Sequence, residues 1–263
     1  MTPLSRRSLL GLAATFSAFG SGPAFAAAIP VVAAASDLNA ALPEVISSFT
    51  RATGNSVRPV YGSSGNFTQQ ILNGAPFEVF LSADEAYVNQ LAAARKTDGR
   101  GALYGIGRIG LFAPTGSPIR CDGRMSDLAP AIRDGRLLRF AIANPEHAPY
   151  GRAAQQALTH VGVWPSILPR LVLGENAAQA TQFATSGSAQ AGIIPYSLGL
   201  TAPVQAAGVF ALISASWHRP LRQRAVAIRG AGPQAQAFLA YLQSPQARAI
   251  FRRYGFALPG DRA

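Results

Sequence analysis

Cysteine and lysine are almost absent from this sequence. Cys121 is the single cysteine among the 263 residues, so the chain can form neither an internal disulfide nor a zinc site built from several cysteines. Lys96 is the single lysine, and arginine supplies every other basic residue. Charged residues make up only 13% of the chain and hydrophobic residues 49%, a balance typical of a globular protein and not of a disordered one.

Acidic residues are also few. The 12 acidic residues stand against 23 basic ones and leave a formal net charge of +11, which favours anionic partners. The arginines are scattered along the chain, and no basic stripe is interleaved with aromatic residues, so nucleic acid is not expected as a partner.

Long hydrophobic runs are missing except near the N-terminus. Arg6 and Arg7 precede a weakly apolar run from Leu9 to Gly20, and a small-x-small pattern ends at Ala26. This arrangement predicts a twin-arginine signal peptide over residues 1–26, with an ordinary secretory signal as the alternative. The run is shorter than the roughly 20 apolar residues that span a bilayer. We therefore expect cleavage near Ala26 and a soluble periplasmic protein.

Short apolar strands alternate with helical patterns along the rest of the chain, which predicts an α/β fold with largely parallel sheets. A first set of elements ends with a strand over 106–112, and a second set begins near Met125. Two sets in one chain of this length indicate two lobes. The sequence has no linker rich in serine or glycine between them, so the chain is expected to cross directly on strands.

In four places an apolar strand is followed by small or polar residues and then by a helix. These places are the stretches at Ser36, at Ser64, at 143–151 and at 173–177. Ligands of open α/β sheets bind beyond the carboxyl ends of strands, where helix N-termini present unpaired N–H groups. Together the four ends would make an anion site from neutral donors, although each taken alone is better explained by ordinary helix capping.

Motifs for catalysis and for metals are absent from the sequence. There is no Gly-x-Ser-x-Gly elbow, no phosphate-binding Walker motif and no cluster with metal-ligand spacing. His147 is the one histidine that is a candidate for a catalytic role. Asp84 is best explained as the N-cap of the following helix. We expect no catalytic residues, no cofactor and no direct protein–metal ligand.

Four segments together resemble the periplasmic molybdate-binding protein family. They are residues 33–36, 74–84, 144–151 and 251–256, in the family's order and spread over nearly the whole chain after the signal. The resemblance implies a two-lobed periplasmic-binding-protein fold of type II with the ligand in the cleft between lobes. We accordingly expect residues 27–112 and 224–263 to form lobe 1 and residues 113–223 to form lobe 2.

The family resemblance also implies an oxyanion site made only of hydrogen-bond donors. Ser36 and Ser64 match two serines that donate through hydroxyl and backbone, while Tyr150 and Ala177 match positions that donate through the backbone N–H. The side chain of Tyr150 is expected to matter little for that bond. Some relatives add a tyrosine at the position that Pro195 occupies here. Tyr196 follows one residue later, so it either reaches the anion or points away from it.

Such a site is expected to hold molybdate and tungstate, which are fully deprotonated, and to reject phosphate, whose proton needs an acceptor. Asp37 is expected to point outward at the start of a helix. The family implies delivery to an ABC permease in the inner membrane, and a monomer is the default expectation. Binding of another anion, such as sulfate, thiosulfate or an organic anion, remains the nearest alternative, and an exported enzyme on the same fold is the remote one.

Overall fold

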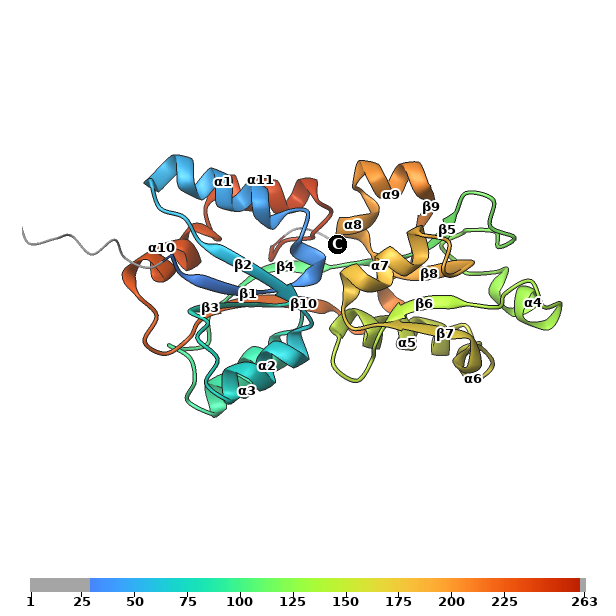
Figure 1. Cartoon of the computed structure of the whole chain (residues 1–263), viewed down its shortest axis with the longest axis horizontal. Helices are drawn as coiled ribbons and strands as arrows, with labels where there is room; N and C mark the ends of the chain where they lie inside the picture. Colours follow the sequence, from blue (N-terminus) through green and yellow to red (C-terminus); the bar gives the residue numbers. More distant parts are fainter. Residues whose placement is uncertain (1–28, 261–263) are drawn as a thin grey trace, which may run out of the picture.

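The chain forms two lobes that lie side by side, each built around a five-stranded sheet (Figure 1). The structure is a computed structural model, and it describes residues 29–260. The predicted signal peptide therefore lies outside the described residues. The strand order is β2-β1-β3-β10-β4 in lobe 1 and β7-β6-β8-β5-β9 in lobe 2.

The elements of lobe 1 come from both ends of the chain. They are β1 (Val31–Ala35), the 3₁₀ turn η1 (Ser36–Leu38), α1 (Leu42–Thr53), β2 (Arg58–Gly62), α2 (Ser64–Leu72), β3 (Val79–Ser82), α3 (Glu85–Ala93), β4 (Ala102–Gly107), β10 (Leu221–Ala227), α10 (Pro233–Tyr241) and α11 (Pro245–Arg253).

The elements of lobe 2 come from the middle of the chain. They are β5 (Ile109–Pro114), α4 (Leu128–Arg133), β6 (Phe140–Ala143), α5 (Pro149–His160), α6 (Trp164–Ile167), η2 (Leu168–Arg170), β7 (Leu171–Gly174), α7 (Ala177–Thr185), β8 (Ala191–Pro195), α8 (Tyr196–Gly199), α9 (Ala202–Ala207), β9 (Gly208–Leu212) and η3 (Ala215–Trp217).

In each sheet one strand runs antiparallel to its neighbours. It is the first strand after the chain crosses from the other lobe. β10 runs antiparallel to β3 and β4, and β5 runs antiparallel to β8 and β9. Arg108 alone separates β4 from β5, so the predicted strand over 106–112 is in fact parts of two strands in different sheets. The sheets divide the chain at Arg108 and before Leu221, whereas the expected divisions at 112/113 and 223/224 fall inside β5 and β10.

The cores follow the two-residue period of the strands. In β1, Val32 and Ala34 pack into a cluster with Phe49 and Phe238, while Ala33 packs on the opposite face with Phe80. All six residues are completely buried, as strands covered by helices on both faces require. Helices α1 and α11 lie over one face of this sheet and α2 and α3 over the other (Figure 1). Helices on both faces thus hold the sheet in place.

Local signals place the helix starts that matter for the site. Ser63 caps α2 by accepting a hydrogen bond from the Asn66 amide at 3.3 Å, and Asn176 caps α7 by accepting from the Gln179 amide at 3.0 Å. Asp84 caps α3 through the Ala86 amide, which confirms its interpretation from sequence. Among residues 29–260, no helix has the length and apolar character needed to cross a membrane.

Candidate anion site between the lobes

All four predicted strand ends meet at one small cavity between the lobes. Ser36 follows β1 and Ser64 begins α2 after β2, whereas Tyr150 and Ala177 lie in the first turns of α5 and α7 in lobe 2. Each of these four residues is at most 5% exposed. The cavity is lined by Ala35, Ser36, Asp37, Gly62, Ser63, Ser64, Ala83, Ala148, Pro149, Tyr150 and Ala177.

The two serine hydroxyls are arranged as donors. The Ser36 Oγ accepts a hydrogen bond from the Ala178 amide at 3.1 Å, and the Ser64 Oγ accepts one from the Ala83 amide at 3.0 Å. Each oxygen is thus held in place by an N–H group, and within the described part of the chain neither hydroxyl donates to an acceptor. A hydroxyl carries one donor hydrogen as well as its lone pairs, so both hydrogens are available to a ligand.

Helix N-termini supply the remaining donors. Ser64, Tyr150 and Ala177 lie in the first turns of α2, α5 and α7, where backbone amides have no acceptor within the helix. Each helix also brings the positive end of its dipole to the cavity. Hydroxyls and amides from both lobes therefore converge on a common point, which is the arrangement that binds an anion.

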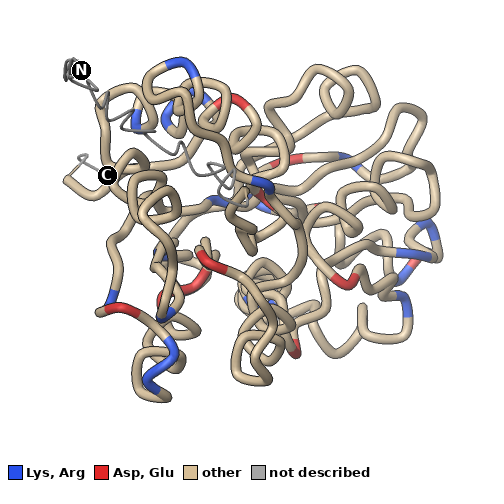
Figure 2. Tube along the Cα trace, turned by 60° about the vertical axis from the view of Figure 1, so that its left-hand side comes forward, with Lys and Arg blue, Asp and Glu red and all other residues tan. Residues whose placement is uncertain are grey.

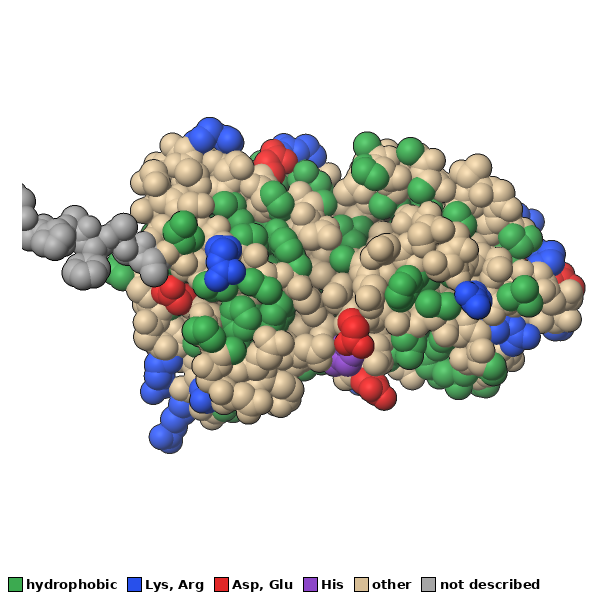
Figure 3. All heavy atoms as spheres, in the orientation of Figure 1, with side chains coloured by type: hydrophobic (Ala, Val, Ile, Leu, Met, Phe, Trp, Pro, Cys, Tyr) green, Lys and Arg blue, Asp and Glu red, His purple; other side chains and the backbone are tan. Residues whose placement is uncertain are grey.

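Cationic side chains take no part in the cavity lining. The basic residues are distributed over both lobes (Figure 2). On the face shown in Figure 3 they are spread over both lobes and do not gather over the junction of the lobes. Within residues 29–260 there is also no group of three or more histidine, cysteine or acidic side chains that could hold a metal ion. The attraction of an anion to this site therefore depends on neutral hydrogen-bond donors.

Asp37 is where the structure contradicts the sequence-based expectation. Its carboxyl group does not point outward but is completely buried and lines the cavity. The Oδ2 atom accepts hydrogen bonds from the Tyr150 hydroxyl at 2.9 Å and from Gln223 Nε2 at 2.7 Å. Burial raises the pKa of Asp37 to about 6, although the bonds from Gln223 and Tyr150 act to lower it. A helix-start position therefore does not determine the side-chain direction here.

The Tyr150 side chain matters more than the sequence indicated. Its hydroxyl joins the lobes by donating to Asp37 and by accepting from Gln223 Nε2 at 3.0 Å. Gln223 itself is held by the Tyr104 hydroxyl, which donates to its Oε1 at 2.6 Å. Neither Gln223 nor Tyr104 could be recognised from the sequence, because a buried glutamine on a strand 186 residues from Asp37 carries no local signal.

Tyr196 is not brought to the cavity. Pro195 ends β8 and precedes the first residue of α8, and the Tyr196 ring stacks on Phe210 with the ring centres 5.5 Å apart. Together with Gly199, Leu200 and other residues it lines a separate pocket. Of the five predicted site residues, the structure thus assembles four and places Tyr196 elsewhere.

We expect Tyr196→Phe to leave oxyanion affinity within about twofold of wild type, because removal of a hydroxyl that makes no ligand contact has no direct energetic effect on binding. Isothermal titration with molybdate checks this expectation. A loss larger than tenfold would show that the tyrosine hydroxyl turns into the cavity when the ligand binds.

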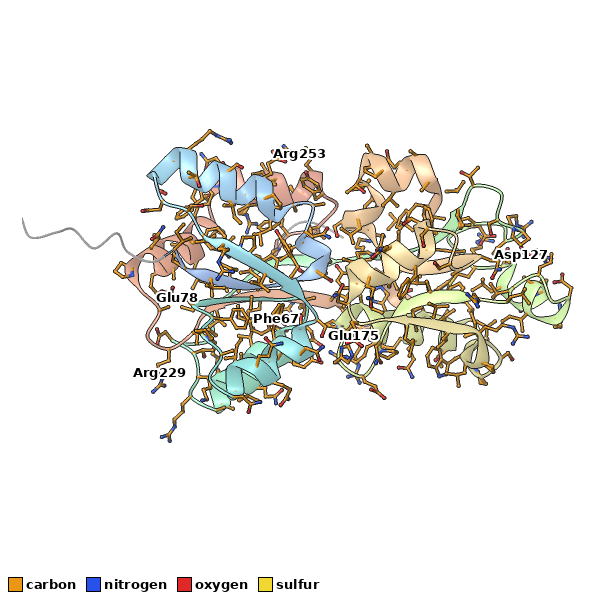
Figure 4. All side chains as sticks on the ribbon, in the orientation of Figure 1. Phe67, Glu78, Asp127, Glu175, Arg229 and Arg253 are labelled. Atoms are coloured by element: carbon orange, nitrogen blue, oxygen red, sulfur yellow. The ribbon has the colours of Figure 1, made fainter. Side chains whose placement is uncertain are left out.

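Contacts between the lobes surround the cavity and close it. The Gly65 amide donates to the His147 carbonyl at 3.0 Å, and the His147 Nδ1 lies 3.0 Å from Ser63 Oγ. On the same side, Arg152 of α5 forms an ion pair with Asp84 at 3.0 Å. Glu175, whose Oε2 lies 3.5 Å from His147 Nε2, is found at this junction in Figure 4. His147 thus acts as a contact between lobes.

Comparisons with known proteins agree with this geometry. Residues 30–257 match the family of bacterial extracellular solute-binding proteins. The molybdate-binding protein ModA of Rhodobacter capsulatus is 34% identical over 235 residues, which cover 88% of this chain and 89% of that protein. ModA of Azotobacter vinelandii is 33% identical, covering 86% and 89%. The solved structure of the Azotobacter vinelandii periplasmic molybdate-binding protein matches with a TM-score of 0.78 at 29% identity, covering 88% of this chain and 99% of that one.

Proposed function

This chain belongs to the family of bacterial extracellular solute-binding proteins, within it to the group of the ModA molybdate-binding proteins, and from this premise we propose that its cavity captures molybdate for an ABC importer. The observation that carries the proposal is the meeting of two donor hydroxyls and three helix N-termini in one buried cavity without a cationic side chain. Ser36, Ser64, Tyr150 and Ala177 are the proposed ligand-binding residues.

The donor chemistry supports a deprotonated tetrahedral dianion. Every oxygen of molybdate accepts hydrogen bonds, so hydroxyls and amides from both lobes can all be satisfied at once. Tungstate has the same charge and nearly the same size, and we propose that the site takes it as well. Sulfate is smaller, so its oxygens would leave longer and weaker bonds to the same donors.

The two-lobed arrangement supports a carrier that closes around its ligand. Donors come from both lobes, so the ligand adds contacts that only the closed arrangement offers, and binding shifts the protein toward closure. We propose that the protein acts outside the cytoplasm after export and that, as a monomer, it delivers the anion to an inner-membrane permease. Opening of the lobes there exposes the donors to water and releases the ligand.

A thermal unfolding series tests the proposed function. Ligand-free protein starting at residue 27 is heated with molybdate, tungstate, sulfate, thiosulfate or phosphate at matched ionic strength. We expect molybdate and tungstate to raise the unfolding midpoint, since a ligand at 100 times its dissociation constant adds about 2.7 kcal/mol to the free energy of unfolding. A rise with sulfate, thiosulfate or phosphate alone would replace the proposed ligand by another anion. No rise with any of them would contradict an oxyanion site.

A further inference from the structure

One buried oxygen at the cavity has no hydrogen-bond partner. Asp37 is completely buried, and its Oδ2 already accepts from Tyr150 and Gln223. Its other oxygen, Oδ1, is buried and has no partner among the described residues. A buried carboxylate oxygen without a donor is costly, and the residue that carries it lines the proposed anion cavity.

Among residues 29–260, no positively charged side chain pairs with this carboxyl group. The elements packed against η1 are β2, α7 and α8, whose ionisable side chains are Tyr61, Tyr196 and Arg58, the last exposed at the opposite end of β2. Tyr150 and Tyr104 belong to the hydrogen-bond network of Asp37 and Gln223. α8 also holds the Asp37 carbonyl, which accepts from the Ser197 hydroxyl at 2.8 Å.

Three arginines of neighbouring elements form ion pairs elsewhere, and Arg108, between β4 and β5, makes no hydrogen bond or ion pair with Asp37. Arg222 and Arg224 flank Gln223 on β10, and both pair with Glu85. Both arginines reach the same Glu85 carboxylate, whereas the completely buried Gln223 side chain donates to Asp37. Arg152 of α5 pairs with Asp84. The Asp37 carboxyl group therefore meets only neutral polar groups.

A bound dianion strongly disfavours the ionised form of Asp37. A carboxylate and a dianion enclosed in one buried site repel each other strongly, and like charges that share a site drive one group to take a proton. Oδ2 is occupied by two donors, which leaves Oδ1 as the atom that binds the proton. Once protonated, the Oδ1–H group is one more neutral donor in a cavity already made of donors.

Building on the proposed function, we propose that Asp37 is a specificity-determining residue that takes up one proton from solvent on Oδ1 when a tetrahedral dianion binds. In the loaded protein the acid is neutral and donates toward the ligand. An ionised Asp37 would instead accept a hydrogen bond, which is what a hydrogen phosphate ion needs. The protonation state of Asp37 therefore decides between two kinds of anion: the neutral acid favours fully deprotonated anions, and the ionised carboxylate favours anions that carry a proton of their own.

The proposal fixes the direction of the pH dependence. Desolvation already raises the pKa of Asp37 to about 6, and a bound dianion raises it further. A group whose pKa is higher in the complex than in the free protein strengthens binding below the free-state pKa and stops doing so as the pH rises through the bound-state pKa. Between these two values, affinity is expected to fall by up to about tenfold per pH unit as the pH rises.

Calorimetric titration with molybdate tests the proposal. At pH 7, titrations in two buffers of different ionisation enthalpy give the number of protons exchanged, and we expect an uptake near one per anion for the wild type. Asp37→Asn keeps the shape of the side chain, the acceptor for Tyr150 and Gln223, and a donor in place of Oδ1–H. This variant is expected to bind molybdate without proton uptake and with an affinity that is flat between pH 6.5 and 8.5.

The exposed Asp98 offers the matched control, because Asp98→Asn removes the same charge far from the cavity and should behave as wild type. Wild-type binding without proton uptake would overturn the inference and leave the proposed function standing. An absence of heat with molybdate, tungstate, sulfate and phosphate would overturn the proposed function, and the inference with it.

Discussion

Replacing Ser36 and Ser64 together by alanine is expected to weaken molybdate binding by roughly 10² to 10⁴-fold, because a hydrogen bond to a charged group contributes about 1.5–3 kcal/mol and the variant loses two of them. Backbone amides hold both hydroxyl oxygens in the closed arrangement, Ala83 of the same lobe for Ser64 and Ala178 of the other lobe for Ser36, which leaves both hydrogens for the ligand. Calorimetry, or competition at low protein concentration, measures the loss.

Ser63 provides the matched control for this double variant. It lies in the same loop as Ser64, but its oxygen caps α2 through the Asn66 amide and faces His147. Ser63→Ala should lower the free energy of unfolding by about 1 kcal/mol, the usual cost of a lost N-cap, and change affinity far less than the double variant does. Unchanged affinity in the Ser36→Ala, Ser64→Ala protein would remove these serines from the site.

Gly65→Ala is expected to weaken binding by roughly 5- to 150-fold by keeping the lobes from closing, which corresponds to about 1–3 kcal/mol of overpacking. A Cβ atom at this position would lie 2.5 Å from the His147 carbonyl oxygen and 2.9 Å from its Cα atom, both in the backbone of the other lobe. It would also lie 2.8 Å from the Tyr87 hydroxyl of its own lobe, the far end of a side chain that can shift once the lobes open. The closed state then becomes rarer, and the apparent dissociation constant rises in proportion. Titration with molybdate measures the effect.

The unfolding of the ligand-free variant separates this effect from damage to the fold. Alanine favours a helix more than glycine does, so Gly65→Ala should not lower the free energy of unfolding of the open protein. Gly232→Ala is the control in the same lobe, since a Cβ there meets only the Glu78 carboxylate at an ordinary 3.4 Å. Equal affinities for the two variants would contradict a tight approach of the lobes at Gly65.

Features that depend on neighbours in sequence could be predicted. The cap at Asp84 and the starts of α2 and α7 follow from side chains that bond amides two or three residues further along the chain. The order of strands and helices likewise follows from hydrophobic periodicity. Because these signals coincide with the ends of β1, β2, β6 and β7, the positions of the four strand-end donors were visible before the fold was known.

The division into lobes was only partly predictable. An apolar, extended pattern continues through Arg108 without a break, so the sequence reads as one strand from Ile106 to Phe112. Sheet membership depends on the partner strands, which are β10 for β4 and β8 with β9 for β5. Pairing with strands about a hundred residues away does not change the local sequence pattern. The boundary between the lobes could therefore be placed only approximately.

The sequence by itself determined the donors of this protein, since serine hydroxyls and first-turn amides follow directly from where a strand ends and a helix begins. Only the tertiary structure decided where Asp37, Tyr150 and Tyr196 point. Asp37 turns inward because Tyr150 and Gln223, 113 and 186 residues away, offer it hydrogen bonds in a buried place. Contacts of that range arise only when both lobes pack together, and they decide whether the cavity holds donors alone or a carboxyl group that must first take a proton.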